Sequence, residues 1–188
     1  MIKAIITDFD GTLVDTFEAN FRAYQDAFRE VGKVLTEEKY RDCFGYRFDR
    51  FMQEMGLENG EITHKIKELK KEAYINHFEH LRLNKSLISL IRDFHNSGGK
   101  TAIASTARKE NLINAVNYLG VAENFDLIFA GVDVQQGKPS PEIYNKTMEA
   151  LGVKPTEVII FEDSPVGFEA AVASGAQYIK VTSKWFDK

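Results

Sequence analysis

The stretch "TDFDGTLVDT" (residues 7–16) directly follows the apolar run "IKAII" (residues 2–6). A short apolar run that ends in turn-forming residues is typical of a buried strand, so Asp8 and Asp10 are predicted at a strand end. Residues two apart in a strand point to the same face, and Gly11 permits a turn just beyond it. If the sheet is parallel, this is the edge where ligands bind.

Two neighbouring carboxylates at a buried strand end need compensation. Like charges a few ångströms apart raise each other's pKa, and burial removes their hydration. A hard divalent cation such as Mg²⁺ prefers oxygen ligands and would balance both charges. On these residues alone, Asp8 and Asp10 could equally cap a loop, which is a common role for Asp.

The chain from Leu83 onward alternates between helical and strand-like patterns, which is typical of an open sheet with helices on its faces. Apolar runs bounded by turn residues predict strands at residues 2–8, 101–105, 125–131, 157–162 and 177–183. The helical spacing of apolar residues predicts helices within residues 85–100, 108–120, 140–152 and 165–175. About five strands are a normal number for one sheet.

Residues 15–80 contain almost no strand-like stretch. Apolar residues recur at spacings of three or four from Phe17 to Val31, which predicts one amphipathic helix. Further helices are predicted at residues 36–44, 47–56 and 61–81. We therefore expect a helical domain, residues 15–80, inserted into a core formed by residues 1–14 and 81–188.

A second acidic pair, Glu162 and Asp163, follows the apolar run "VIIF" and belongs to the stretch "FEDSP" (residues 161–165). Because the carboxyl ends of parallel strands meet at one edge of a sheet, this pair would join the first and complete an oxygen site. The alternative is that Asp163 or Ser164 is simply the N-cap of the next helix.

Two more polar groups are predicted at the same edge. Lys138, in "GKPSPEIY" (residues 137–144), precedes a helix and could place its ammonium beside carboxylates or a bound anion. Ser105 and Thr106 end a strand and open a helix, where hydroxyls and free N–H groups form a phosphate cradle. A lone lysine is usually solvated and Ser and Thr are common N-caps, so the coincidence of all these groups at strand ends indicates the site.

Composition excludes several other classes of protein. The formal charge of -4, with basic residues spread along the chain, disfavours nucleic acid as a partner. The single cysteine, Cys43, excludes a disulfide framework within the chain and fits a reducing compartment. No apolar run is long enough for a membrane span, and no targeting segment begins the chain. We expect a soluble, cytoplasmic protein that is a monomer or weak homodimer.

Four motifs, "DFDGTLVDT", "IAST", "GKPSPEIY" and "FEDSPVGFEAA", resemble in order and spacing the signatures of the haloacid dehalogenase superfamily. The resemblance covers the whole chain and is to the branch of small phosphatases and sugar-phosphate mutases. It implies an α/β fold, with a Rossmann-like parallel sheet core and an inserted small α-helical cap domain. A receiver-like regulatory module is disfavoured, because it would carry no helical insertion after the first strand.

The resemblance also implies roles for single residues. Asp8 would be the nucleophile that forms an aspartyl-phosphate, and Asp10 the general acid and base. Mg²⁺ would be held by Asp8, by the backbone carbonyl of Asp10 and by Asp163. Glu162 would be a supporting or water-mediated ligand of the same ion.

The remaining implied residues bind the phosphoryl group. Ser105 would donate a hydrogen bond to its oxygens, and Lys138 would offset charge between Asp8 and the phosphate. The cradle would be completed by backbone groups near Phe9, Asp10, Gly11 and Thr106. In the cap, Arg47 and Arg50 are candidates for binding an anionic substrate, although exposed arginines are also common on solvated helices.

These roles together predict a Mg²⁺-dependent phosphatase that hydrolyses a small phosphate ester, either phosphoglycolate-like or a sugar phosphate. The alternative is a sugar-phosphate mutase similar to β-phosphoglucomutase, which would use the same two aspartates. The two differ in whether water or a substrate hydroxyl accepts the phosphoryl group. A true dehalogenase is disfavoured, because that branch is not expected to keep the second aspartate.

Overall fold

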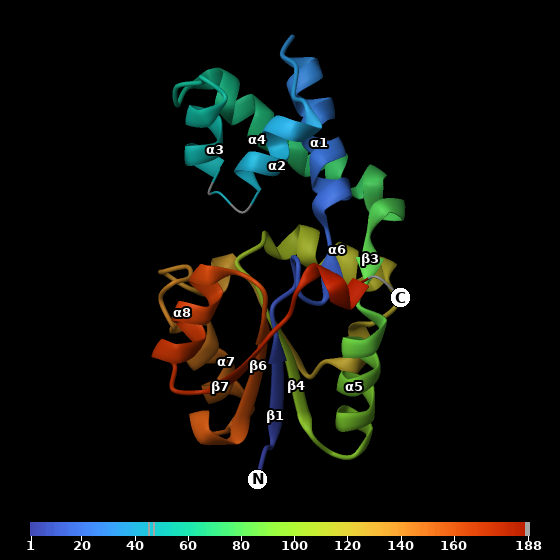
Figure 1. The fold of residues 1–188 in the computed structure, drawn as a ribbon, viewed down its shortest axis with the longest axis vertical. Helices are drawn as coiled ribbons and strands as arrows, with labels where there is room; N and C mark the ends of the chain where they lie inside the picture. Colours follow the sequence, from blue (N-terminus) through green and yellow to red (C-terminus); the bar gives the residue numbers. More distant parts are fainter. Residues whose placement is uncertain (45, 47, 187–188) are drawn as a thin grey trace. The chain divides into compact units, whose positions relative to one another are not determined.

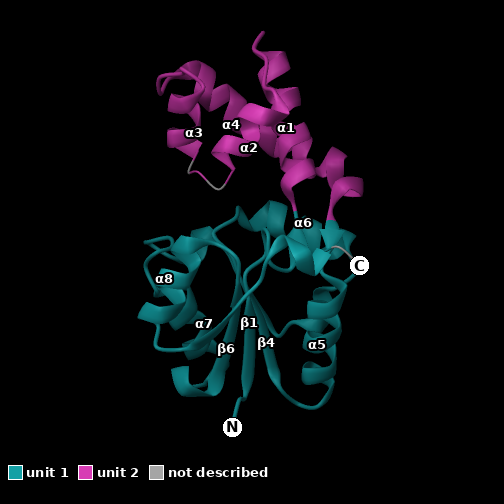
Figure 2. Cartoon of the chain, viewed as in Figure 1, with its two compact units in different colours: residues 1–15, 82–188 teal, residues 16–81 magenta. Residues whose placement is uncertain are grey.

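The chain, seen in a computed structural model, forms two compact units (Figure 2). Unit 1 comprises residues 1–15 and 82–188, and unit 2 comprises residues 16–81. The structure describes residues 1–44, 46 and 48–186. The chain therefore passes between the units twice, once after Asp15 and once after Leu81.

Unit 1 is built on a five-stranded sheet with the order β5-β4-β1-β6-β7, in which all neighbours are parallel. The strands are β1 (Ala4–Thr7), β4 (Lys100–Ala104), β5 (Leu127–Phe129), β6 (Val158–Glu162) and β7 (Gln177–Lys180). β1 is the central strand and is buried along its whole length, as expected for a strand covered on both faces. The predicted α/β fold class with its parallel sheet is confirmed.

Helices cover both faces of this sheet, with α7 and α8 on one face and α5 on the other (Figure 1). Their bounds are α5 (Lys85–Asn96), α6 (Lys109–Tyr118), α7 (Glu142–Leu151) and α8 (Pro165–Ala173). Short 3-10 turns lie between them: η2 (Ala122–Asn124), η3 (Gly131–Asp133), η4 (Pro155–Glu157) and η5 (Ser183–Phe186). One buried cluster joins the sheet to α7 and α8 and includes Ile6, Tyr144, Ile160 and Ala170.

A two-stranded antiparallel ribbon, β2 (Val14–Asp15) and β3 (Arg82–Leu83), was not expected from the sequence. It pairs the segment that leaves unit 1 with the segment that returns to it, and the Arg82 guanidinium donates to the Asp15 carboxylate across it. Strands this short carry no periodic pattern, so they leave no signal in the sequence.

The described residues of unit 2 form helices joined by turns and loops, with no strand among them, as the spacing of apolar residues predicts. It contains α1 (Phe17–Glu30), α2 (Glu37–Cys43), α3 (Phe48–Glu54), α4 (Glu61–Ala73) and η1 (Tyr74–His80). The expectation of continuous helical structure at residues 61–81 needs correction. The α-helix ends at Ala73 and a 3-10 segment follows, with a non-helical backbone at His77.

The core of unit 2 is aromatic. The ring of Tyr40 lies 5.3 to 5.9 Å, centroid to centroid, from five other rings, those of Phe17, Phe21, Tyr24, Phe44 and Phe51. Cys43 is buried in the same cluster. Such ring pairs stabilise a fold beyond the burial of their area, so unit 2 has a core of its own.

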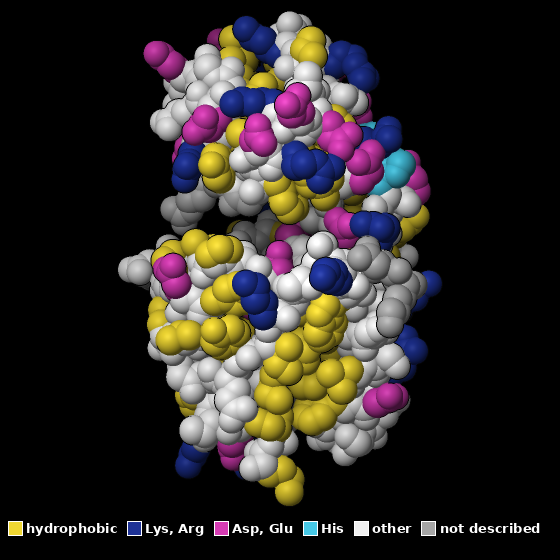
Figure 3. Space-filling view, in the orientation of Figure 1, with side chains coloured by type: hydrophobic (Ala, Val, Ile, Leu, Met, Phe, Trp, Pro, Cys, Tyr) yellow, Lys and Arg dark blue, Asp and Glu magenta, His cyan; other side chains and the backbone are white. Residues whose placement is uncertain are grey.

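The surface carries both signs of charge. On the face visible in Figure 3, lysine and arginine side chains are interspersed with aspartate and glutamate rather than gathered in a stripe. Among the described residues, no helix combines the length and apolar character that a membrane span needs.

Candidate active site

Asp8 follows the central strand β1 and lies between the ends of β4 and β6. Its backbone N–H donates to the Phe161 carbonyl of β6 (2.9 Å), while the N–H of Ser105, just after β4, donates to the Phe129 carbonyl of β5 (3.1 Å). Ladder bonds of this kind extend the sheet by one residue and align the strand ends. The sheet register therefore brings residues that are far apart in sequence to one edge.

Lys138 reaches this edge from the loop before α7. Its Nζ donates to Asp8 Oδ1 (2.6 Å) and to Glu162 Oε2 (2.6 Å). The Lys138 side chain is only 5% exposed, against 10% for Asp8 and 1% for Glu162. This is a buried charge network, in which an ammonium between two carboxylates offsets their desolvation. These two contacts place the Lys138 ammonium beside carboxylates, which is one of the two positions that its sequence context predicted.

The Glu162 carboxylate is saturated by hydrogen bonds. Its Oε2 accepts from Lys138 Nζ and from the Tyr144 hydroxyl (2.6 Å). Its Oε1 accepts from the N–H groups of Asp163 (3.0 Å) and Ser164 (3.1 Å) and from the Ser164 hydroxyl (3.0 Å). Burial raises the pKa of Glu162, but Lys138 and the hydrogen bonds outweigh it and lower the pKa below its ordinary value. Glu162 thus stays ionised and holds the other groups in place.

The Asp163 carboxylate accepts fewer hydrogen bonds than that of its neighbour Glu162. Its Oδ1 accepts from the Thr12 hydroxyl (2.8 Å). The pKa of Asp163 is raised to about 6, and burial is the main cause. The turn at Gly11 has a φ of +80°, and a Cβ there would lie 2.2 Å from Asp163 Oδ2. Only glycine therefore allows the loop after β1 to approach this carboxylate.

The charges at this edge do not balance. Asp8, Glu162 and Asp163 each place a carboxylate oxygen within 4.8 Å of the others. Lys138 supplies one positive charge against these three negative ones. Burial also raises the pKa of Asp8, although Lys138 opposes the shift. Burial lowers the pKa of Lys138, but Asp8, Tyr144 and Glu162 outweigh it and raise this pKa well above its ordinary value. Three carboxylates around one ammonium favour the binding of a further cation, of a kind that takes oxygen ligands.

The other predicted site residues lie at the same strand ends. Ser105 is 2% exposed, and its Oγ accepts from the Ala107 N–H (3.1 Å), which leaves its O–H to donate. Thr106 is exposed, and Phe9 is buried with its carbonyl bonded to the turn that follows. Asp10 is partly buried and lies in that turn, where it bridges to Val14.

The two arginines proposed for substrate binding belong to unit 2. Arg50 lies over the ring of Tyr46, with its guanidinium carbon 3.9 Å from the ring centroid. Arg47 lies outside the described residues.

Three residues of this edge received no role from the sequence. Thr12 binds Asp163, Tyr144 binds Glu162, and the Asn84 side chain donates to the Thr12 carbonyl (3.1 Å) while capping α5 through the Leu87 N–H. All three are fully buried. Thr12 and Tyr144 both lie within motifs quoted above and could have been suspected, whereas nothing near Asn84 in sequence marks it. Ser164 caps α8 through the Gly167 N–H, as the alternative interpretation expected, and Asp163 does not.

Comparison with known proteins gives one family over nearly the whole chain. Residues 5–181 match the family model described as haloacid dehalogenase-like hydrolase. A phosphorylated carbohydrates phosphatase of Thermotoga maritima is 31% identical over 182 residues, which cover 95% of this chain and 84% of that protein.

Two solved proteins share the fold with similar identity. CbbY from Rhodobacter sphaeroides, crystallised with phosphate and, as a mutant, with xylulose-(1,5)-bisphosphate, superimposes with a TM-score of 0.85 at 28% identity. The match covers 98% of this chain and 88% of CbbY. A putative β-phosphoglucomutase from Thermotoga maritima gives a TM-score of 0.77 at 29% identity, over 96% of this chain and 86% of that one.

Proposed function

Because this chain belongs to the haloacid dehalogenase-like hydrolase family, we propose that it is a Mg²⁺-dependent phosphatase that hydrolyses the monoester of a small phosphorylated carbohydrate. The reaction takes place at the carboxyl edge of the parallel sheet in unit 1. The observation that carries the proposal is the buried group of Asp8, Glu162 and Asp163 around the ammonium of Lys138.

The residues at this edge fit a divalent metal. Three carboxylates meet one ammonium, so a divalent cation would balance the buried charge. Carboxylate oxygens are the ligands that Mg²⁺ prefers. We assign the ion to Asp8 and Asp163, with the Asp10 carbonyl as a further ligand. Glu162 already accepts five hydrogen bonds, so its assigned role is to support the site by holding Lys138. Bound Mg²⁺ would supply charge that stabilises the transferring phosphoryl group.

The proposed reaction has two displacements at phosphorus. An oxygen of the Asp8 carboxylate attacks phosphorus, the ester P–O bond breaks, and Asp10 gives its proton to the leaving alkoxide. Water then attacks the aspartyl-phosphate, Asp10 takes its proton, and the P–O bond to Asp8 breaks to release phosphate. Lys138 and the Ser105 hydroxyl hold the phosphoryl oxygens in both steps, where positioning and charge provide most of the catalysis.

Unit 2 is assigned as the cap that selects the substrate. This assignment gives Arg47 and Arg50 the role of binding an anionic part of the substrate. It follows from the place of the insertion in the chain, between β1 and the other strands of the five-stranded sheet. The names of the relatives favour a sugar phosphate over a phosphoglycolate-like compound, because one is a phosphatase of phosphorylated carbohydrates and another binds a pentulose bisphosphate.

A sugar-phosphate mutase is the second candidate. It is favoured by the match to the putative β-phosphoglucomutase, and it would use Asp8 and Asp10 in the same way. The two functions differ only in the group that attacks the aspartyl-phosphate, which is water in one and a substrate hydroxyl in the other.

The test is release of inorganic phosphate from a panel of sugar phosphates and small phosphate esters. We expect release with Mg²⁺ and none after EDTA, restored when Mg²⁺ is added in excess. Release that persists in EDTA would contradict the metal dependence. Isomerised sugar phosphate without release, seen by ³¹P NMR, would replace the phosphatase by the mutase.

A further inference from the structure

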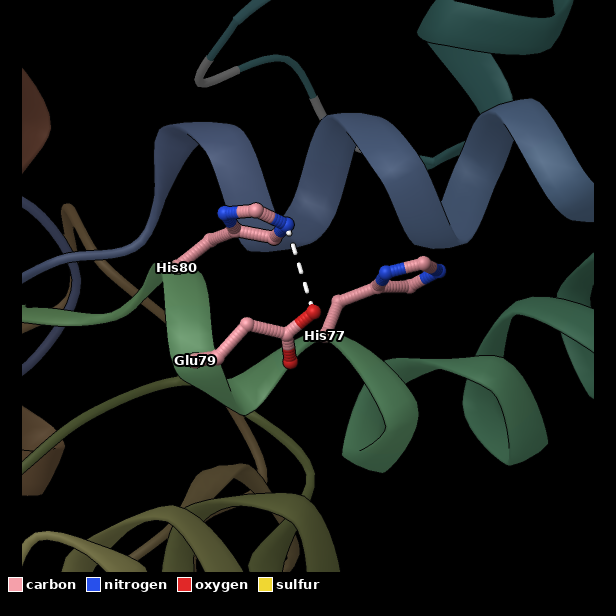
Figure 4. A group of neighbouring side chains, drawn as sticks. All are labelled: His77, Glu79 and His80. Atoms are coloured by element: carbon pink, nitrogen blue, oxygen red, sulfur yellow. Dashed lines mark ion pairs between the residues drawn. The ribbon is translucent and has the colours of Figure 1, made fainter.

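A second group of potential metal ligands lies in unit 2, apart from the group at the sheet edge. His77, Glu79 and His80 each offer one ligand atom, and these atoms lie within 4.8 Å of one another. Figure 4 shows the two imidazole rings and the carboxylate gathered on one side of η1. The His80 Nε2 lies 3.4 Å from Glu79 Oε1.

The backbone explains why these side chains meet. Side chains three residues apart eclipse in a 3-10 helix, so His77 and His80 come to the same face of η1. Their rings are stacked, with centroids 6.2 Å apart. The backbone of His77 has φ −118° and ψ 16°, which departs from regular helical geometry at this point.

The Asp26 carboxylate favours one tautomer of the neutral His77 ring, the one whose Nδ1 can bind a metal. Its Nε2 lies 2.6 Å from Asp26 Oδ2 of α1, and the other Asp26 oxygen accepts from Arg29 (3.1 Å). An ionised carboxylate only accepts hydrogen bonds, so in the neutral ring Nε2 carries the hydrogen and Nδ1 keeps its lone pair. Figure 4 shows one ring nitrogen of His77 facing Glu79 and His80 while the other points away from them. A carboxylate behind the imidazole is the usual support of a metal-bound histidine.

We propose that His77, Glu79 and His80 form a binding site for a transition-metal ion of the Zn²⁺ class, with Asp26 as the residue that orients His77. Two imidazole nitrogens and one carboxylate oxygen suit Zn²⁺ and leave a fourth position for water. The same ligands are unsuited to Mg²⁺, which prefers oxygen. The side chains of His77 and His80 are 17% and 30% exposed, so an ion can reach them from solvent.

The site lies in the last element of unit 2, since η1 ends one residue before the chain crosses to unit 1. Its three ligands come from four consecutive residues, and Asp26 ties them to α1. A bound ion would therefore hold the side chains of η1 together, and through the contact between His77 and Asp26 it would also hold η1 against α1. The expected physical effect is slower amide hydrogen exchange in Tyr74–His80.

The test is calorimetric titration of ZnCl₂ into the chelator-treated full-length chain, in a buffer with excess MgCl₂ to occupy the carboxylates at the sheet edge. We expect one Zn²⁺ per chain, bound at least about tenfold more weakly by His80→Ala. His64→Ala is the matched control, because His64 is an exposed histidine of α4 outside the group; it should bind Zn²⁺ as the native chain does.

Two further variants distinguish this site from the carboxylates of the sheet edge. Asp163→Asn should keep the Zn²⁺ site, whereas loss of binding would place the ion at the sheet edge instead. Asp26→Asn should weaken Zn²⁺ binding by about tenfold, because it removes the support of His77. In long-range ¹H–¹⁵N NMR spectra, Zn²⁺ should shift the Nδ1 signal of His77 and the Nε2 signal of His80. No Zn²⁺ uptake by the native chain, or uptake unchanged in His80→Ala, would overturn the proposal.

Discussion

The two units use charge in opposite ways. At the sheet edge of unit 1, the charged groups are buried and their contacts join distant segments: Lys138 and Asp8 are separated by 130 residues, and Asp163 and the Thr12 hydroxyl that it binds by 151. In unit 2, several ion pairs are exposed and local, joining residues three or four apart on one helix. Unit 2 is held together by its aromatic core instead.

This difference separates chemistry from stability. Buried ion networks rarely stabilise a fold more than apolar packing would, because desolvation offsets their attraction. Exposed pairs contribute at most about 1 kcal/mol each. The charged edge of unit 1 is therefore best explained by its function, and the aromatic cluster of unit 2 by its packing. Substitutions in the two units should accordingly differ in whether they reduce activity or stability.

The largest effect is expected from Asp8→Asn. The amide is a poor nucleophile, so phosphate release should fall by at least about 10³-fold. The fold should persist, since the change removes one of three crowded carboxylates and leaves Glu162 to pair with Lys138. Phosphate release and thermal unfolding followed by circular dichroism measure the two quantities. An unfolded Asp8→Asn variant would show that the carboxylate serves stability after all.

Lys138→Met is expected to reduce both phosphate release and the stability of the fold. It leaves the carboxylates of Asp8 and Glu162 buried without their ammonium, which costs about 3–5 kcal/mol of unfolding free energy in comparable buried pairs. Urea denaturation at neutral pH measures this loss. Lys109→Met is the matched control, because Lys109 also pairs with a carboxylate but is 45% exposed, against 5% for Lys138. Equal losses for the two variants would contradict the distinction between buried and exposed pairs.

The fold of unit 1 could be predicted because its strands are apolar runs bounded by turn residues, and each is buried in a parallel sheet. That a parallel sheet gathers its strand ends at one edge was enough to predict that Asp8, Lys138 and Asp163 lie near one another. The break between α4 and η1 could not be predicted. No glycine or proline marks Ala73 or His77, and the helical spacing of apolar residues continues through both.

The partners within the site were also beyond the sequence. Tyr144 is an apolar position of a helix by its spacing, and its hydroxyl meets Glu162 only because α7 packs on the sheet. Thr12 meets Asp163 across two loops from opposite ends of the chain. Local patterns predict which face of an element is buried, but not which polar atom of another element it contacts there.

A smaller effect is expected from Phe51→Leu in unit 2. Phe51 is 3% exposed and its ring lies against those of Tyr24, Phe28 and Tyr40. Loss of these ring contacts should cost about 1–2 kcal/mol of unfolding free energy. Phe44→Leu, at a ring that is 40% exposed, should cost less. Urea denaturation compares them, and an equal loss would show that burial of the aromatic core is not what stabilises unit 2.

The smallest effect is expected from Glu142→Gln, at a partly exposed carboxylate of unit 1 that is held by two hydrogen bonds and an ion pair. It accepts from the N–H groups of Gln135 (3.0 Å) and Gln136 (2.8 Å) and pairs with Lys146 (2.9 Å). These contacts, the Gln135 N–H first, lower the pKa of Glu142 from 4.5 to about 2. The carboxylate thus orders the loop that leads to Lys138.

The pH dependence of this variant follows from the direction of that shift. A lowered pKa in the folded chain means that the charged form favours folding, so Glu142 contributes its full stability above pH 4.5 and loses it as the pH falls toward 2. The difference in melting temperature between the native chain and Glu142→Gln should therefore be largest at about pH 6 and shrink at about pH 3. A difference that stays constant would mean that the amide keeps the same bonds. In that case the geometry of the loop, and not charge, would hold Lys138 at the buried edge.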